Sequence, residues 1–337
     1  MINKYITILL FMISCSMAHA LPTMNVTIQV IDENNQPLKQ AKSGIVLSHD
    51  RAKGQGSGTD TSHVYGISDN NGEVSIGGET LMPVTVYAKK DGYYGSGLRY
   101  DLREVSGLVG FRKWQPQNST VKIVLKKKIN PIPLHAIKLR PQVLPHLNTF
   151  IGFDLIEKDW VIPYGQGVSK DLLIKFTKHY ANSRSDYNVE IEIKFPNDRD
   201  GLIEILDQEL KSDHGISQLK MPHNAPMDGY MSKYNRQYIR KPSVIYTTDT
   251  LDSVIPRKDV NYFFRIRSKT NSKGIVSALY GKIHGPIMIT DFKNNDSRAS
   301  ILFTYYLNPV ENDTNLEFDT SKNMFENLNR KEQVNEP

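Results

Sequence analysis

The stretch that decides the fold is MNVTIQVI, residues 24–31, near the start of the chain. Its apolar residues Met24, Val26, Ile28 and Val30 stand at every second position, with polar residues between them. A period of two places alternate side chains on opposite faces of an extended segment, so the pattern predicts a strand with one buried face. The chain therefore begins its fold as a β-sheet.

The same alternation recurs along the whole chain. Tyr, Pro and Gly are plentiful, at 17, 17 and 22 residues, which also favours strands and turns. Only residues 203–211 suggest a short helix, and residues 212–234 suggest a long loop. The predicted fold class is mainly β, with two β-sandwich-type domains in tandem and little helix. Further strands are predicted at 44–48, 64–67, 73–76, 84–88, 120–125, 171–180, 187–195, 261–268, 277–289 and 299–307. The Asn71-Gly72 pair predicts a hairpin between two of them.

Residues 1–20 have the three parts of an export signal peptide in order. Lys4 supplies the positive start, residues 6–13 form a short apolar run, and Ala18-His19-Ala20 is a small-x-small cleavage site. The mature chain is then predicted to start at Leu21. The run is too short to span a bilayer, and no later stretch approaches the roughly 20 apolar residues that spanning needs, so no transmembrane segment is predicted. The predicted location is the periplasm, the cell surface or the medium.

Cys15 is the only cysteine and lies inside this signal. Cleavage before Leu21 leaves a mature chain without a thiol, which excludes disulfides and Cys-ligated metals. The alternative is that Met12-Ile13-Ser14-Cys15 acts as an imperfect lipoprotein box, with Cys15 lipidated in an outer-membrane lipoprotein. Plain cleavage is favoured because the Ala-x-Ala site is the better match.

The formal net charge of +6 is unevenly distributed. Residues 311–337 carry seven acidic and three basic side chains, and the signal carries one lysine, which leaves +9 on the body between them. Export makes nucleic acid an unsuitable partner. If the charge has a function, it indicates an anionic envelope polymer or glycan, and the alternative is an ordinary basic surface that keeps the protein soluble.

Three blocks in the first third carry a family resemblance. DENNQPLKQA, YGISDNNGEVSI and VTVYAKKDGYYG resemble successive blocks of the carboxypeptidase-regulatory-like module, a transthyretin-like β-sandwich, over residues 24–128. The resemblance implies a non-catalytic unit that folds by itself and presents the neighbouring domain. The matching positions are Pro37, Leu38, Ala41, Asp69, Gly72, Gly92 and Tyr93.

The remaining chain resembles a group of exported bacterial proteins of unknown function. The predicted domains are residues 21–128, the regulatory-like module, and 149–325, a second β-rich domain. A Pro-rich linker or extended segment, 129–148, joins them, and a polar tail, 326–337, follows. Residues 308–325 are expected to pack on the second domain, with fraying only beyond Asn327. The predicted anchors are Leu307, Leu316, Phe318, Met324 and Phe325.

Searches for catalytic motifs give no site. None of the nine histidines is followed three positions later by Glu, which excludes the zinc pair of a metallocarboxypeptidase. Gly-x-Ser-x-Gly elbows, phosphate loops and dinucleotide fingerprints are also missing. Ser119-x-x-Lys122, Ser217-x-x-Lys220 and Ser68-Asp69-Asn70 occur without the helix start and Lys-Thr-Gly that a penicillin-recognising enzyme needs. We therefore predict no catalytic, cofactor-binding or metal-binding residue and no cofactor.

Two weaker groups of residues remain. His49, Asp50, Asp60 and His63 bracket a Gly-rich insert and could form a metal site, although polar loop ends that are merely solvated are the commoner case. Trp160, Tyr164 and Trp114 could stack on sugars, with Trp160 more simply a core residue between its apolar neighbours.

The leading functional hypothesis is an exported, non-enzymatic envelope or secreted protein that binds or scaffolds through its β-sandwiches, with an unidentified ligand. The alternative is a hydrolase of envelope polysaccharide that uses the scattered carboxylates Asp154, Asp159 and Asp171. Glycosidase carboxylates carry no local motif, so the sequence leaves both open. The oligomeric state is not predicted.

Overall fold

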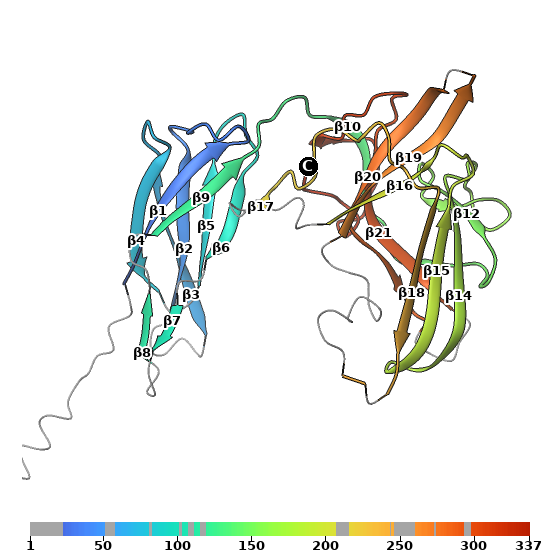
Figure 1. The fold of residues 1–337 in the computed structure, drawn as a ribbon, viewed down its shortest axis with the longest axis horizontal. Coiled ribbons are helices and arrows are strands. Elements are labelled where there is room, and N and C mark those ends of the chain that lie inside the picture. The colour runs from blue at the N-terminus through green and yellow to red at the C-terminus, as the bar shows by residue number, and fades with distance from the viewer. Residues whose placement is uncertain are drawn as a thin grey trace, which may run out of the picture. The chain divides into compact units, whose positions relative to one another are not determined.

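Every regular element of the computed structural model is a strand within the residues that it describes, which confirms the mainly β fold class (Figure 1). These residues are 23–50, 58–80, 83–100, 103–106, 111–114, 119–206, 216–242, 244–245, 260–272, 274–292 and 298–337. The predicted signal, Cys15 and the cleavage site lie outside them. In these ranges no helix has the length and hydropathy to cross a membrane. The chain divides into unit 1, Met1–Lys127 with Asp213–Ser217, and unit 2, Lys128–Ser212 with Gln218–Pro337.

Unit 1 is a β-sandwich of two sheets with one apolar interior. The alternating residues of the opening strand are all buried, with Met24, Val26, Ile28 and Val30 at most 1% exposed. They pack with apolar residues of the facing sheet, among them Ile45, into a single cluster. The first sheet has the order β4 (Glu73–Glu79), β1 (Thr23–Asp32), β9 (Ser119–Leu125). The second has the order β17 (Ile216–Ser217), β6 (Ser96–Tyr100), β5 (Val84–Lys89), β2 (Lys42–Asp50), β3 (Thr59–Ile67), and β7 (Arg103–Ser106) pairs with β8 (Phe111–Trp114).

The Asn71-Gly72 turn connects the two sheets of unit 1, and the hairpin predicted there is wrong. Strand β3 pairs with β2, whereas β4 pairs with β1. The reason is an anchor in the interior: the buried Ser68 hydroxyl donates to the Leu38 carbonyl at 2.7 Å and accepts the Ala41 amide at 2.9 Å. Gly72 has φ +76°, and a Cβ there would lie 2.4 Å from a backbone oxygen of β1. The turn is therefore a corner that crosses from one sheet to the other.

Unit 2 is a larger sandwich of two sheets. Buried aromatic and aliphatic residues of both sheets, such as Phe153, Phe176, Ile191, Phe264 and Tyr305, form one cluster between them. One sheet has the order β16 (Gly201–Leu206), β19 (Val260–Asn271), β20 (Gly274–Thr290), β21 (Ser300–Leu307), β10 (Ile132–Lys138), β22 (Phe318–Asn323), with β11 (Gln142–Val143) also on β21. The other has the order β13 (Asp159–Trp160), β12 (Ile151–Asp154), β14 (Leu172–Ser183), β15 (Asp186–Lys194), β18 (Lys233–Arg240).

Strands β19 and β20 are buried on both faces. Phe263 and Tyr280 point away from the main core and pack with Met221, Ala225 and Leu316 from segments without regular structure. Those segments include much of the predicted loop 212–234. The sheet therefore has a covered second face, and β19 accordingly has three consecutive aromatic residues at Tyr262–Phe264.

One expectation for local structure is corrected, and the structure gives detail for another, the Pro-rich linker or extended segment at 129–148. Residues 201–206 form β16, which pairs with β19 along its length. The helix predicted from 203 is therefore wrong over its described part. The sequence pattern there suits a helix as well as a strand, and pairing within the sheet decides for the strand. Residues 132–138, in the Pro-rich stretch, form β10 between β21 and β22. The pairing of β10 with β22 shifts register around Pro133, which has no N–H to donate.

The C-terminal residues are held in place beyond Asn327, so the expected fraying there is wrong. Val334 is 4% exposed and packs against residues of β10, β21 and β22. The Lys138 amide donates to the Glu332 carbonyl at 2.9 Å. Of the predicted anchors upstream, Leu307, Leu316, Phe318 and Phe325 are buried, whereas Met324 is 42% exposed.

Candidate functional site

The four residues considered for a metal site on the β2–β3 hairpin are not brought together as one group in the described structure. His49 lies directly opposite Asp60, and Val46 lies opposite His63. Opposite residues share a face and neighbours alternate, so the odd spacing between Asp60 and His63 puts them on different faces. His49 instead bonds Ser62 through Nε2 at 2.7 Å. The side chain of Asp50 is not described, and no group of His, Cys, Asp and Glu suited to a metal occurs in the described ranges.

Two of the carboxylates proposed for hydrolysis, Asp154 and Asp171, are brought together by Arg267. The Arg267 Nε donates to Asp171 Oδ1 at 2.7 Å, and its Nη2 donates to Asp171 Oδ2 at 2.8 Å and to Asp154 Oδ1 at 3.1 Å. Both carboxylates are only 2% exposed. Arg267 reaches them from a β-bulge in β19, where its own φ is +55°. The arrangement is a buried ion cluster with a strained backbone at its centre.

The backbone also contributes to this cluster. Asp154 accepts amides of Ile156, Glu157, Val168 and Ser169 at 2.7–3.1 Å. Burial is the largest influence on Asp154 and opposes its charge, but these hydrogen bonds outweigh it and lower the pKa. Burial raises the pKa of Asp171 despite its contact with Arg267. The pKa of Arg267 is raised, first by its hydrogen bond to Asp171, so the guanidinium stays charged.

The third carboxylate, Asp159, shapes the loop that follows it. It accepts the amides of Trp160 and Gln166 at 2.7 Å each. A side chain on Gly165 would collide with Asp159 and with the Trp160 carbonyl, so this loop needs its glycine. All three carboxylates thus organise loops near β12, and each is already engaged by protein donors.

The predicted aromatic residues separate into core and surface. Trp160 is 4% exposed and packs edge-on against Phe153, with ring centroids 5.2 Å apart, as a core residue does. Tyr164 is 43% exposed, and its ring meets the edge of His146 at 5.2 Å. The side chain of Trp114 lies outside the description.

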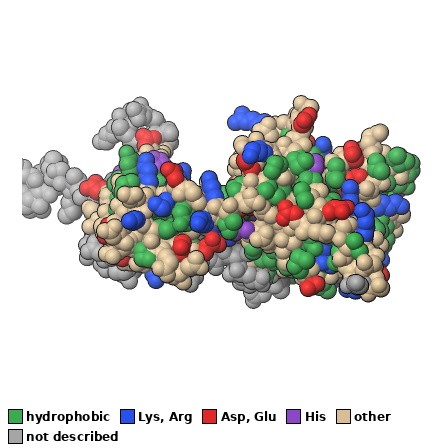
Figure 2. All heavy atoms as spheres, turned by 90° about the horizontal axis from the view of Figure 1, so that it is seen from above, with side chains coloured by type: hydrophobic (Ala, Val, Ile, Leu, Met, Phe, Trp, Pro, Cys, Tyr) green, Lys and Arg blue, Asp and Glu red, His purple; other side chains and the backbone are tan. Residues whose placement is uncertain are grey.

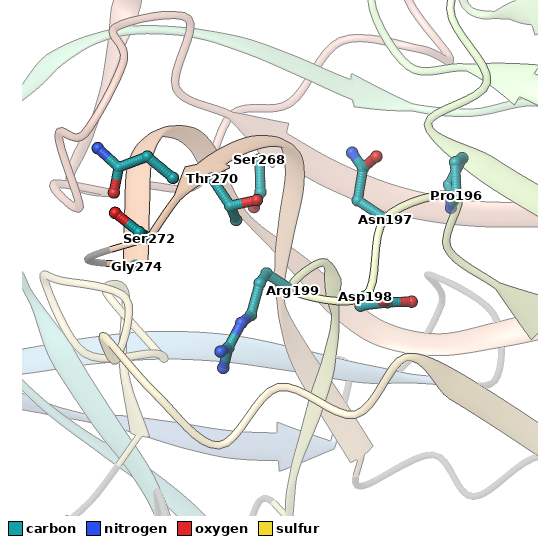
Figure 3. Close-up of a pocket in the computed structure, with 9 residues that line it drawn as sticks. Pro196, Asn197, Asp198, Arg199, Ser268, Thr270, Ser272 and Gly274 are labelled. Atoms are coloured by element: carbon teal, nitrogen blue, oxygen red, sulfur yellow. The ribbon is translucent and has the colours of Figure 1, made fainter.

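A polar pocket of about 590 Å³ lies in unit 2, between the turn that joins β15 to β16 and the tip of the β19–β20 hairpin (Figure 3). No sequence motif indicated it. The only hint is the period-two spacing of Ser268, Thr270 and Ser272, which places three hydroxyls along one side of the hairpin. The full lining is Pro196, Asn197, Asp198, Arg199, Ser268, Thr270, Asn271, Ser272 and Gly274.

Buried hydrogen bonds fix the wall of this pocket. Asp200, 1% exposed, accepts the Asn197 side-chain amide at 2.8 Å and the Ser268 backbone amide at 3.0 Å. Arg265 is 5% exposed and donates through Nε to the Arg199 carbonyl at 2.8 Å. The turn is therefore tied to β19 from two sides, and the pocket is preorganised.

Ser268 lies in the wall of the pocket, and its hydroxyl oxygen is shielded from solvent. The residue is 9% exposed, and its Oγ has no hydrogen-bond partner in the described structure. A buried hydroxyl without a partner costs about 1–3 kcal/mol. Around it stand further hydroxyls and amides that can both donate and accept. The arrangement is suited to a ligand rich in hydroxyl groups.

Basic residues do not gather into one patch on the face seen in Figure 2. Lys and Arg side chains are scattered over both units among acidic and neutral ones. On this face the Lys and Arg side chains therefore form no single basic surface that could bind an anionic polymer.

Comparisons with known proteins give only distant likenesses. No protein-family model matches the chain, and no curated protein matches it at a significant level. Among solved structures, it is similar to a candidate carbohydrate binding protein from Bacteroides uniformis, at 10% identity and TM-score 0.17, covering 85% of this chain and 98% of that one. A streptococcal ancillary pilin has 10% identity and TM-score 0.19, over 83% and 58% of the two chains. The Corynebacterium diphtheriae major pilin SpaA has 8% identity and TM-score 0.19, over 77% and 69%. With scores this low, what those proteins bind or assemble into is not transferred to this chain.

Proposed function

We propose that this protein is an exported, non-enzymatic binding protein whose second unit holds a glycan segment in the polar pocket. The first unit, with its resemblance to the carboxypeptidase-regulatory-like module, presents the second. Its place is the cell surface, the periplasm or the medium, with lipidation of Cys15 as the alternative that attaches it to a membrane. The observation that carries the proposal is the preformed pocket, whose lining of hydroxyl and amide groups includes the exposed side chain of Thr270.

The pocket lining favours a polyhydroxylated ligand over an apolar one. A volume of about 590 Å³ lies within the range of small-molecule sites. Sugar hydroxyls donate and accept, and so do the hydroxyl and amide groups of Thr270, Ser272, Asn197 and Asn271.

The state of the carboxylates argues for binding without turnover. A general acid or base must exchange a proton with the substrate, which requires a carboxyl group open to it. Asp154 and Asp171 are buried and engaged by Arg267 and backbone amides, and Asp159 holds its loop. The hydrolase hypothesis therefore loses the residues on which it was based.

The test is a glycan and peptidoglycan-fragment array probed with residues 21–337, followed by analysis of reducing ends. Thr270→Val is expected to weaken binding about fivefold, because Thr270 is an exposed residue of the lining and one hydrogen bond contributes about 1 kcal/mol. Thr85→Val is the matched control, since Thr85 is also an exposed strand threonine but lies on β5, outside the pocket lining. Equal affinity in the two variants, or no bound glycan, overturns the proposal. The appearance of new reducing ends would support the hydrolase hypothesis instead.

A further inference from the structure

The first and last strands of unit 1 are neighbours and run in the same direction. Strand β1 pairs in parallel with β9 through seven residue pairs, from Val26 opposite Ser119 to Asp32 opposite Leu125. Both arrows point the same way in Figure 1. The chain enters β1 at Thr23 and leaves β9 at Leu125, so these two points lie at opposite ends of the strand pair.

This arrangement determines how unit 1 responds to a stretching force applied along the chain. Tension between Thr23 and Leu125 slides β1 past β9, and the hydrogen bonds between them, which cross the direction of the pull, are loaded together. In a pair pulled from one end, the bonds break one after another. Strand β1 is also paired with β4 on its other edge, again through seven residue pairs. It cannot slide without breaking both ladders.

The side chains of the two strands resist the same movement. Val26, Ile28 and Val30 of β1 and Ile123 of β9 are at most 1% exposed and share one core cluster. Sliding by one residue would turn each of these side chains toward the wrong face. Packing and hydrogen bonding therefore oppose the same displacement.

We propose that unit 1 is a load-bearing tether in the lipidated form of the protein, in which Cys15 anchors the start of the chain and unit 1 carries the tension between that anchor and unit 2. This role rests on the proposed function, because the load arises only when unit 2 holds a ligand while the start of the chain is held elsewhere. The parallel β1–β9 pair is the mechanical clamp, and the partner of the tether is the ligand held by unit 2.

Single-molecule force spectroscopy on residues 21–337 tests the clamp. These residues include no cysteine, so paired substitutions give unique attachment points. Thr23→Cys with Lys127→Cys loads the clamp lengthwise. Asn34→Cys with Lys127→Cys pulls the same two strands from one shared end, since Asp32 lies opposite Leu125. Unit 1 is expected to unfold at a clearly higher force in the first geometry. Equal forces in the two geometries overturn the proposal.

A pair of core variants separates mechanical strength from stability. Val121→Ala on β9 and Val86→Ala on β5 remove the same group from buried sites, 3% and 0% exposed, in opposite sheets. At constant lengthwise force, Val121→Ala is expected to shorten the lifetime of unit 1 about tenfold, the effect of 1.4 kcal/mol on a rate. An equal effect of Val86→Ala would mean that β1–β9 is no clamp. Both measurements are made without ligand, so their failure leaves glycan binding untouched, and a chain that binds no glycan leaves them valid.

Discussion

Replacing Arg267 by Met tests the ion cluster of unit 2. The change removes three charge-assisted hydrogen bonds and leaves the carboxylates of Asp154 and Asp171, each 2% exposed, without their counter-charge. Removing one partner of a buried ion pair costs about 3–5 kcal/mol. In a unit of about 200 residues, each 1 kcal/mol lowers the melting temperature by roughly 2–4 °C. We expect the melting temperature of unit 2 to fall by about 6–20 °C.

A second substitution shows whether unpaired charge is the cause. Burial raises the pKa of Asp171, so its charged form is costly once Arg267 is gone. Asp171→Asn added to Arg267→Met is therefore expected to recover part of the lost stability. The control is Arg236→Met, which also removes an arginine bonded to a carboxylate, Glu204, but from an exposed pair, 45% and 30%. It should cost about 1 kcal/mol or less.

The assay is thermal and urea unfolding followed by the fluorescence of Trp160, the tryptophan of unit 2. Trp114→Phe removes the only other tryptophan, so the signal reports on unit 2 alone. A loss of stability in Arg267→Met no larger than in Arg236→Met refutes the reasoning. So does a failure of Asp171→Asn to recover any stability, because the cost would then come from packing and not from charge.

Three other outcomes are expected. Deleting residues 328–337 should lower the melting temperature by several degrees, since it exposes the site of Val334 at a cost of about 2 kcal/mol; an unchanged melting curve contradicts this. Burial, followed by two nearby cations, lowers the pKa of His135, so folding stability should fall as pH drops below about 6.5, where the unfolded chain gains the proton first. His135→Leu should flatten that pH profile, and the exposed His179→Gln should not. Gly281→Ala should destabilise unit 2 by about 1–3 kcal/mol in urea titrations, because its Cβ would fall 2.0 Å from a phenyl carbon of β19.

Strands with one buried face could be predicted from sequence. In 24–31 and 187–195 the apolar residues alternate with polar ones, and the structure buries the expected side chains, such as Val26 and Ile191. Strand β16 was missed because its residues suit a helix as well, and the prolines around β10 left a linker and an extended segment both open. In both, pairing with strands distant in sequence decides the conformation, and a local pattern does not contain that information.

The candidate site was less accessible to sequence. The sequence did not show that strand β3 starts as early as Thr59, and it is this extension that places Asp60 and His63, an odd number of residues apart, on different faces. The neighbourhood of Asp154 and Asp171 could not be foreseen, because Arg267 reaches them from a bulge 96 residues after Asp171. The pocket depends on the same bulge, which directs Ser268 toward the segment that joins β15 to β16. Such sites become visible only when the strands are assembled.

The pairing of β10 has a consequence for the order of folding. Its partners in the sheet are β21 and β22, the last two strands of the chain. In the finished sheet, Leu134 and Ala136 cluster with Tyr306, Phe318 and Val334, which the ribosome has not yet made while it is working on the middle of the chain. Contacts between such distant segments form slowly, because a long loop must close first. Unit 2 therefore cannot complete its seven-stranded sheet until β21 and β22 have been made, and one edge of the partly formed sheet stays unpaired until then.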